Sequence, residues 1–252
     1  MREFWASERS LSILLWTLGL TMFVVLPTVV LLGAPEWERA IAAVFFTVLV
    51  VTGLSTVWQM REARRLLIVI GTVPLVLLWI EIAYHPPVVS LFTGGMRMLL
   101  VAIFATVLFA RVIAPGRVTK ARIKGAVAVY LLIGLVFAEA YRLLCIAFPG
   151  AISVHTSNSL SVKFTEELLY FSFSTLTTAG YGDIVPVHPL ARSLSNLEAI
   201  AGQMYVVLLI GRLLTLHMSQ SDELAEERVE AEVERVESEL RTTEPRRPIH
   251  KG

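Results

Sequence analysis

The sequence predicts an all-α membrane protein with six transmembrane helices and a short re-entrant helix between the fifth and the sixth. Of its 252 residues, 55% are hydrophobic, more than the roughly 45–50% of a typical soluble domain. The apolar residues lie in runs of about 18–25, a length that crosses a hydrocarbon core of about 30 Å. These runs lack the two-residue alternation of a membrane β-barrel, so helices are the expected spanning structures.

Six apolar runs are expected to span the bilayer. They cover residues 11–32, 40–60, 66–84, 96–113, 127–148 and 194–218. Proline-containing turns close the third, fourth and fifth runs, at 85–87, 115–116 and 149–150. The first run is longer than the apolar region of a signal peptide, about 7–15 residues. A transmembrane helix is therefore favoured there, with a cleaved signal peptide as the alternative.

The loop charges predict the orientation in the membrane. Basic residues cluster before the first span and in the second and fourth loops, and these stretches must share one side. They are Arg2, Arg9, Arg61, Arg64, Arg65, Arg117, Lys120, Arg122 and Lys124. The positive-inside tendency makes that side cytoplasmic. We expect a multi-pass protein of the cell membrane with both termini in the cytoplasm and the segment between the last two spans outside.

The sequence gives no support for a nucleic-acid-binding protein, a disulfide-stabilised protein or an enzyme. The net charge of +1 gives no reason to expect a nucleic-acid partner. Cys145 is the one cysteine, so no disulfide can form within the chain. No phosphate-binding, zinc-protease or hydrolase motif occurs. We therefore expect neither an enzyme nor a cofactor.

The outer segment is predicted to re-enter the membrane. Residues 149–164 are small and polar, as in an exposed turret. Residues 165–175 are apolar but too short to span, and Thr165 with Glu166 and Glu167 suits a helix start. A Gly-rich stretch, 178–182 (TAGYG), follows. Irregular backbone at membrane depth is tolerated only where protein buries it or where it lines water.

The residue types of this stretch suit a cation site made of carbonyl groups. Gly180 and Gly182 permit the unusual backbone that turns successive carbonyls toward one axis. The Thr178 hydroxyl can add to the innermost site, Tyr181 is expected to brace the strand against the re-entrant helix, and Asp183 to attract cations at the mouth. Such a site needs several strands, and the chain has one, so an oligomer is required.

On these residues the chain resembles the potassium channel superfamily, over roughly residues 122–218. Seven positions match the family's filter pattern: Thr175, Thr177, Thr178, Gly180, Tyr181, Gly182 and Asp183. The resemblance implies a homotetramer in which K⁺ is bound by Thr178, Ala179, Gly180 and Tyr181 and passes down its gradient. It also implies that Tyr170 and Phe171 surround the filter and that Gly202, in the last span, is the hinge of a gate.

Two filter positions depart from the family pattern. Ala179 replaces the usual Val or Ile, and Ser174 stands where some bacterial relatives have a glutamate. The smaller Ala179 side chain leaves open a weakly selective cation channel. A subunit of a potassium transporter and a non-conducting regulatory subunit are further alternatives. The single filter-like loop argues against the transporter, and the intact motif argues against the regulatory subunit.

Further residues of the membrane spans are candidates for function. Gln203, Val206 and Ile210 are expected to line the water-filled cavity, with ordinary packing as the alternative for the two apolar residues. Glu198 is expected to hydrogen-bond the re-entrant helix, with proton sensing as a minority alternative. For Glu81 and Glu139 a structural role is favoured, with Glu139 pairing with Arg142.

The fourth span does not resemble a voltage sensor. Its only basic residues are Arg97 and Arg111, about 21 Å apart on a helix. A sensor needs about 3–4 charges that cross the field. Both arginines are expected to reach the two interfaces by snorkelling, so strong voltage gating is not expected.

We expect three regions: a four-helix transmembrane domain at 1–116, a pore domain at 117–218 and a cytoplasmic tail at 219–252. In the tail, Val229, Val233, Val236 and Leu240 are spaced as in a heptad seam. A short coiled coil between subunits and a solvated helix continuing the last span are equally compatible with this pattern. Residues 242–252 are expected to be disordered.

Overall fold

The computed structural model describes residues 2–25, 27–28, 87–114, 119–154 and 164–243, with residues 44, 46–48, 50, 51, 72 and 76 between them. The expected second and third spans, with Glu81, therefore lie mostly outside the described residues. The chain forms two compact units, residues 1–114 with 119–209, and residues 115–118 with 210–252. Each is described by itself below.

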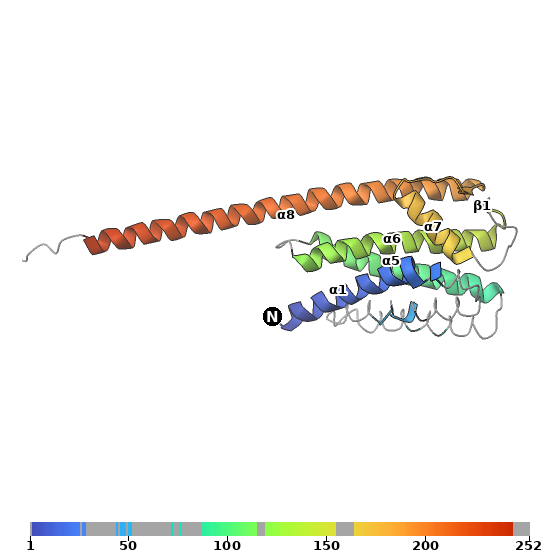
Figure 1. The fold of residues 1–252 in the computed structure, drawn as a ribbon, viewed down its shortest axis with the longest axis horizontal. Coiled ribbons are helices and arrows are strands. Elements are labelled where there is room, and N and C mark those ends of the chain that lie inside the picture. The colour runs from blue at the N-terminus through green and yellow to red at the C-terminus, as the bar shows by residue number, and fades with distance from the viewer. Residues whose placement is uncertain are drawn as a thin grey trace, which may run out of the picture. The chain divides into compact units, whose positions relative to one another are not determined.

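The first unit is a helical bundle (Figure 1). Helix α1 (Arg2–Leu20) runs into a π-helical turn at Thr21–Val25 and packs against α6 (Lys120–Ala147), which also packs along α5 (Pro87–Ile113). Buried side chains recur every three or four residues, as at Leu11, Leu14 and Leu18, so each helix turns one face to its neighbours. In α6 the buried face is rich in Gly and Ala, which let membrane helices approach closely.

Helix α5 starts earlier than the sequence predicts. The fourth span was expected from residue 96, after a loop at 85–95, but the helix begins at Pro87. Proline is well suited to a first helical turn. Gly94, within this first part of the helix, is buried, and a Cβ there would collide with the Arg142 guanidinium and with Leu143. The glycine is therefore explained by close packing between α5 and α6.

Three helices of the described part of the chain are long and apolar enough to cross a membrane. Their apolar windows are Ser90–Ile113, Lys120–Ala147 and Pro189–Arg212, and a shorter apolar helix covers Leu11–Val25. The fifth span thus begins at Lys120 instead of 127, where the Thr119 hydroxyl caps the helix by accepting from the Arg122 amide. The last helix, α8, is continuous over Pro189–Thr243, longer at both ends than the expected span.

The chain is not purely α-helical. Strand β1 (Ile152–Val154) pairs antiparallel with β2 (Ile184–Pro186), with Ser153 opposite Val185. Ala151, Ile152 and Ile184 are buried against Tyr141 and Cys145 of α6. The expectation of a wholly exposed polar turret at 149–164 is therefore wrong for its first residues, because they form a strand that covers an apolar cluster. The sheet ties this segment to the residues that follow Asp183.

Helix α7 (Phe164–Leu176) matches the predicted re-entrant helix. It runs obliquely between α6 and the start of α8 (Figure 1). Gly134 of α6 allows a close approach, because a Cβ there would lie 2.8 Å from the Phe173 ring. The Ser172 hydroxyl donates to the Gly134 carbonyl at 2.7 Å. Packing and a hydrogen bond thus fix α7 on α6 at the same point.

Candidate functional site: a pore loop between two membrane helices

The loop after α7 has an alternating backbone conformation. Thr178, Gly180 and Gly182 have φ of 58°, 56° and 82°, while Ala179 and Tyr181 between them keep negative φ. Left-handed backbone costs an L-residue about 1–2 kcal/mol, and a β-branched threonine rarely adopts it. When left-handed and right-handed backbone conformations alternate along a strand, successive peptide groups turn so that their carbonyls point in the same direction. Strain of this kind at Thr178 is characteristic of functional sites.

Ser174 of α7 holds the loop from behind. Its carbonyl accepts from the Gly180 amide at 3.2 Å, and its hydroxyl accepts from the Tyr181 amide at 3.4 Å. The Thr175 carbonyl accepts from the Thr178 amide at 2.9 Å. The amides of Thr178, Gly180 and Tyr181 therefore point back toward the helix, and no hydrogen bond described for the loop uses a carbonyl of residues 178–182. Ser174 thus contacts the loop directly, through both its carbonyl and its hydroxyl.

Aromatic and acidic side chains meet at the outer end of the loop. The Tyr170 and Tyr181 rings stack with centroids 5.7 Å apart and an interplanar angle of 11°, and the Asp183 carboxylate lies close enough to Tyr170 to interact with it electrostatically. Phe171 does not join them. It packs edge-on against Tyr141 of α6, with centroids 4.9 Å apart, so it anchors α7 instead of touching the loop.

The inner end of the loop contacts α8. The Gln203 side-chain amide donates to the Thr178 hydroxyl at 3.2 Å, and that hydroxyl donates to the Thr177 carbonyl at 2.6 Å. Val206 and Ile210 follow Gln203 at spacings of three and four and so lie on its face of the helix. Both are exposed, at 40% and 60%. The three residues form one surface of α8 that leads away from the loop.

Gly202 lies against the end of α7. A Cβ at this position would collide with the Leu176 carbonyl oxygen and lie 3.0 Å from the Leu176 Cδ1. The Tyr130 hydroxyl donates to the same carbonyl at 3.3 Å. This packing accounts for a glycine at 202 without a hinge, because only a residue lacking a side chain lets α8 approach the base of the loop.

The expected hydrogen bond from Glu198 to α7 is present. Glu198 is completely buried, and its carboxyl group contacts the Ser172 hydroxyl of α7 and the Tyr141 hydroxyl of α6, the latter at 2.7 Å. The sequence pointed to Glu198 because a carboxyl group in the membrane needs partners. It gave no comparable signal for Tyr141 and Ser172, since hydroxyl-bearing residues are common in membrane helices.

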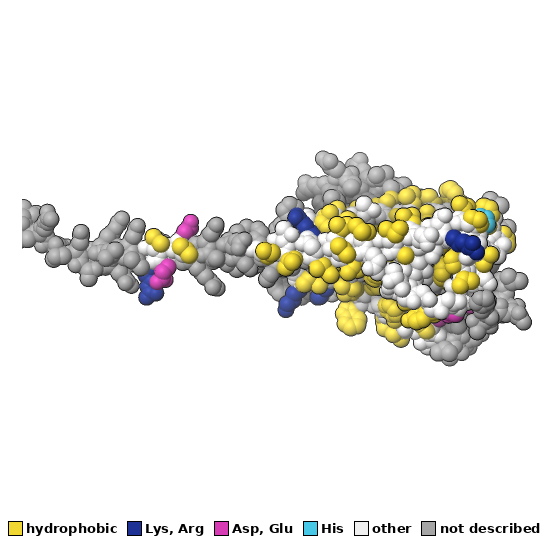
Figure 2. All heavy atoms as spheres, turned by 90° about the horizontal axis from the view of Figure 1, so that it is seen from above, with side chains coloured by type: hydrophobic (Ala, Val, Ile, Leu, Met, Phe, Trp, Pro, Cys, Tyr) yellow, Lys and Arg dark blue, Asp and Glu magenta, His cyan; other side chains and the backbone are white. Residues whose placement is uncertain are grey.

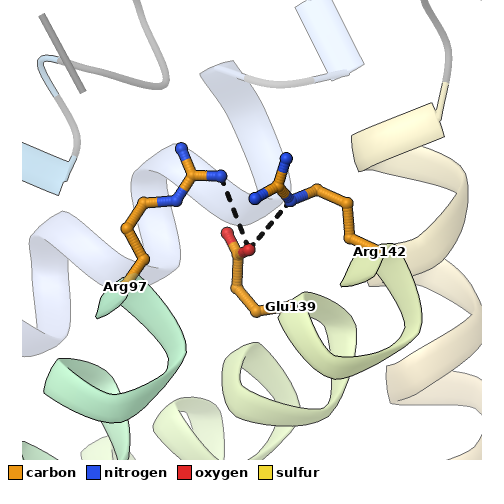
Figure 3. Close-up of polar contacts among 3 residues, drawn as sticks. All are labelled: Arg97, Glu139 and Arg142. Atoms are coloured by element: carbon orange, nitrogen blue, oxygen red, sulfur yellow. Dashed lines mark hydrogen bonds and ion pairs between the residues drawn. The ribbon is translucent and has the colours of Figure 1, made fainter. Parts of the chain in front are cut away.

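A partly buried ion-pair cluster joins α5 and α6 (Figure 3). The Arg142 Nε lies 2.9 Å from the Glu139 Oε2, as predicted, and the Arg97 Nη2 lies 3.6 Å from the same oxygen. The expectation that Arg97 snorkels to the interface is wrong, because its side chain is only 12% exposed and faces Glu139. An arginine held in this way is not free to move across the membrane field.

The loop is exposed in a single chain. Every residue from Thr177 to Asp183 is exposed, with Tyr181 at 70%. Many large apolar side chains of α8 are also at least half exposed, among them Leu197, Ile200, Met204, Val207 and Leu208. Figure 2 shows apolar side chains spread over the outside of the first unit. Lipid or further protein chains are expected to cover these apolar surfaces.

A comparison with known families agrees with the site. Residues 125–218 match the family model described as "Ion channel", which covers α6, α7, the loop and the first part of α8. This segment is an ion-channel pore domain of the potassium channel family, so the resemblance seen in the motif is confirmed. This segment therefore belongs with ion channels and not with enzymes. No curated protein and no solved structure gave a significant match.

Proposed function

We propose that four copies of this chain form a K⁺-selective channel in the cell membrane, with Thr178–Gly182 as the selectivity filter. The main support for this proposal is the alternating backbone conformation, with positive φ at Thr178, Gly180 and Gly182. A strand of this shape presents a column of carbonyl oxygens, and rings of such oxygens replace the hydration shell of K⁺. The ion moves passively down its electrochemical gradient, with both chain termini in the cytoplasm.

The surroundings of the loop support a pore that is formed between chains. Among the hydrogen bonds described for this part of the chain, none uses a carbonyl of residues 178–182, whereas the amides of Thr178, Gly180 and Tyr181 bond to α7. Four exposed loops around one axis would supply the missing oxygen ligands. Gln203, Val206 and Ile210 would line the cavity beneath the filter, and Asp183 would gather cations at the outer mouth.

A weakly selective cation channel is the second candidate, and Ala179 is the observation in its favour. The usual Val or Ile at this position packs behind the strand, whereas the Ala179 side chain is a single methyl group. A looser filter would hold its carbonyl rings less firmly and discriminate less between K⁺ and Na⁺. The arrangement of the pore would be the same, so ion selectivity separates the two candidates.

Substitution of Gly180 by alanine tests the role of the filter. An L-residue at φ 56° is strained by about 1–2 kcal/mol in each subunit, although no atom lies within 4 Å of the added Cβ. G180A is expected to abolish K⁺ flux into liposomes. G95A is the matched control, because Gly95 lies in α5 with no atom within 4 Å. Wild-type flux through G180A would contradict the assignment of the filter.

A further inference from the structure

Glu198 lies where three helices of the pore domain meet. It belongs to α8, its Oε2 contacts the Tyr141 hydroxyl of α6 at 2.7 Å, and its Oε1 contacts the Ser172 hydroxyl of α7. The Ser172 Oγ also lies 2.7 Å from the Gly134 carbonyl oxygen of α6. Glu198 and Ser172 are both fully buried, at 0% exposure, so water does not complete these contacts.

A count of hydrogen atoms determines the protonation of the carboxyl group. Three contacts between oxygens need three hydrogens, and the Gly134 carbonyl supplies none. Tyr141 and Ser172 supply one each. Because a carbonyl only accepts, Ser172 must donate its single hydrogen to Gly134, and the hydrogen between Ser172 and Glu198 must then belong to Glu198.

An ionised Glu198 would leave this cluster incomplete. One of the two Ser172 contacts would then join oxygens with no hydrogen between them, which is repulsive at hydrogen-bond distance. A buried carboxylate also requires a cation or several donors to offset its lost hydration. The contacts described for Glu198 include Ser172 and Tyr141 but no Lys or Arg side chain.

We propose that Glu198 is a neutral carboxylic acid in the folded channel and that it positions the pore helix α7. It accepts from Tyr141 and donates to Ser172, so one directional chain of hydrogen bonds runs from Tyr141 through Glu198 and Ser172 to the Gly134 carbonyl. This chain joins α8, α6 and α7 without burying a charge.

The connection bears on the filter because Ser172 lies two residues before Ser174. Ser174 accepts from the amides of Gly180 and Tyr181, so the placement of α7 sets the placement of the filter strand. The influence on conduction rests on the proposed function. The protonation of Glu198 depends only on the packing of α6, α7 and α8, and can be tested without any ion current.

Infrared difference spectroscopy on the full-length protein in lipid at neutral pH tests the protonation. The spectrum of the wild type minus that of E198Q is expected to contain the carbonyl band of a protonated carboxylic acid and no loss of carboxylate bands. The opposite pattern, in which E198Q loses carboxylate bands, would overturn the proposal. In S172A the acid loses its acceptor, so its band is expected to persist at a higher frequency. An unshifted band would contradict donation to Ser172.

Two substitutions of Glu198 test the positioning role by K⁺ flux. The amide of E198Q has a donor for Ser172 and an acceptor for Tyr141, so this variant is expected to keep most of the flux. E198L has a similar volume but neither group, and is expected to lose it. Equal loss in both variants would contradict a neutral donor and acceptor. If flux is absent from the wild type as well, the proposed function fails while the infrared result on Glu198 still stands.

Discussion

At the scale of single residues, Gly202 illustrates how one observation supports two different roles. Its register in the last span suggests a hinge, as in the family. The structure places its Cα against the Leu176 carbonyl, where any side chain would collide. The glycine then keeps α8 close to the base of the filter. This packing role predicts a loss of stability on substitution, whereas a hinge role predicts a loss of opening alone.

Substitution G202A separates these two roles. Forcing a methyl group against the Leu176 backbone is expected to destabilise the pore domain by about 1–3 kcal/mol, measured by thermal denaturation in detergent. G211A is the control, because Gly211 lies on the same helix with no atom within 4 Å of an added Cβ. A G202A protein as stable as the wild type that no longer opens would favour the hinge.

Gln203 gives a second prediction for a single residue. Q203L removes the 3.2 Å hydrogen bond to the Thr178 hydroxyl and, if Gln203 lines the proposed cavity, makes that part of the wall apolar. We expect a reduced single-channel current, since ions would meet fewer polar groups as they leave the filter. M204L, on the neighbouring exposed position of α8, should conduct as the wild type does. An unchanged current in Q203L would remove Gln203 from the ion path.

At the scale of helices and strands, the sequence predicted best where one physical requirement dominates. The extent of α7 followed from an apolar stretch too short to span and an acidic first turn. The starts of α5 and α6 were missed, because Gly94 and the basic residues near Lys120 look like loop signals. Only tertiary contacts show that the Arg142 side chain occupies the space where a Cβ of residue 94 would lie. The sheet was missed because its strands have three residues each.

The ion-pair cluster between α5 and α6 gives a prediction at this scale. E139Q leaves the Arg97 and Arg142 guanidinium groups without their shared carboxylate. Breaking a buried pair costs about 3–5 kcal/mol, and the residual exposure of 12–15% lowers the expectation to about 2–3 kcal/mol. Thermal denaturation measures this loss. E230Q, at an exposed position of α8, should not change the stability, and an equally stable E139Q would show that the cluster is not needed.

At the scale of the whole molecule, the proposed function requires several chains, because one chain supplies only one filter strand. The filter strand and the apolar face of α8 are exposed together, as expected if neighbouring copies cover them. The sequence predicted this need for several chains, because one motif supplies only one column of carbonyls. The helix that continues to Thr243 is compatible with both expectations for the tail, a coiled coil between subunits and a solvated extension.

The reversal potential of the purified protein in a planar bilayer tests the central claim most directly. The membrane separates solutions with opposed K⁺ and Na⁺ gradients. The filter geometry at Thr178, Gly180 and Gly182 predicts a reversal potential close to the K⁺ equilibrium potential, which would also make Ala179 a tolerated substitution. A reversal potential near zero would contradict K⁺ selectivity and identify a cation pore loosened at Ala179.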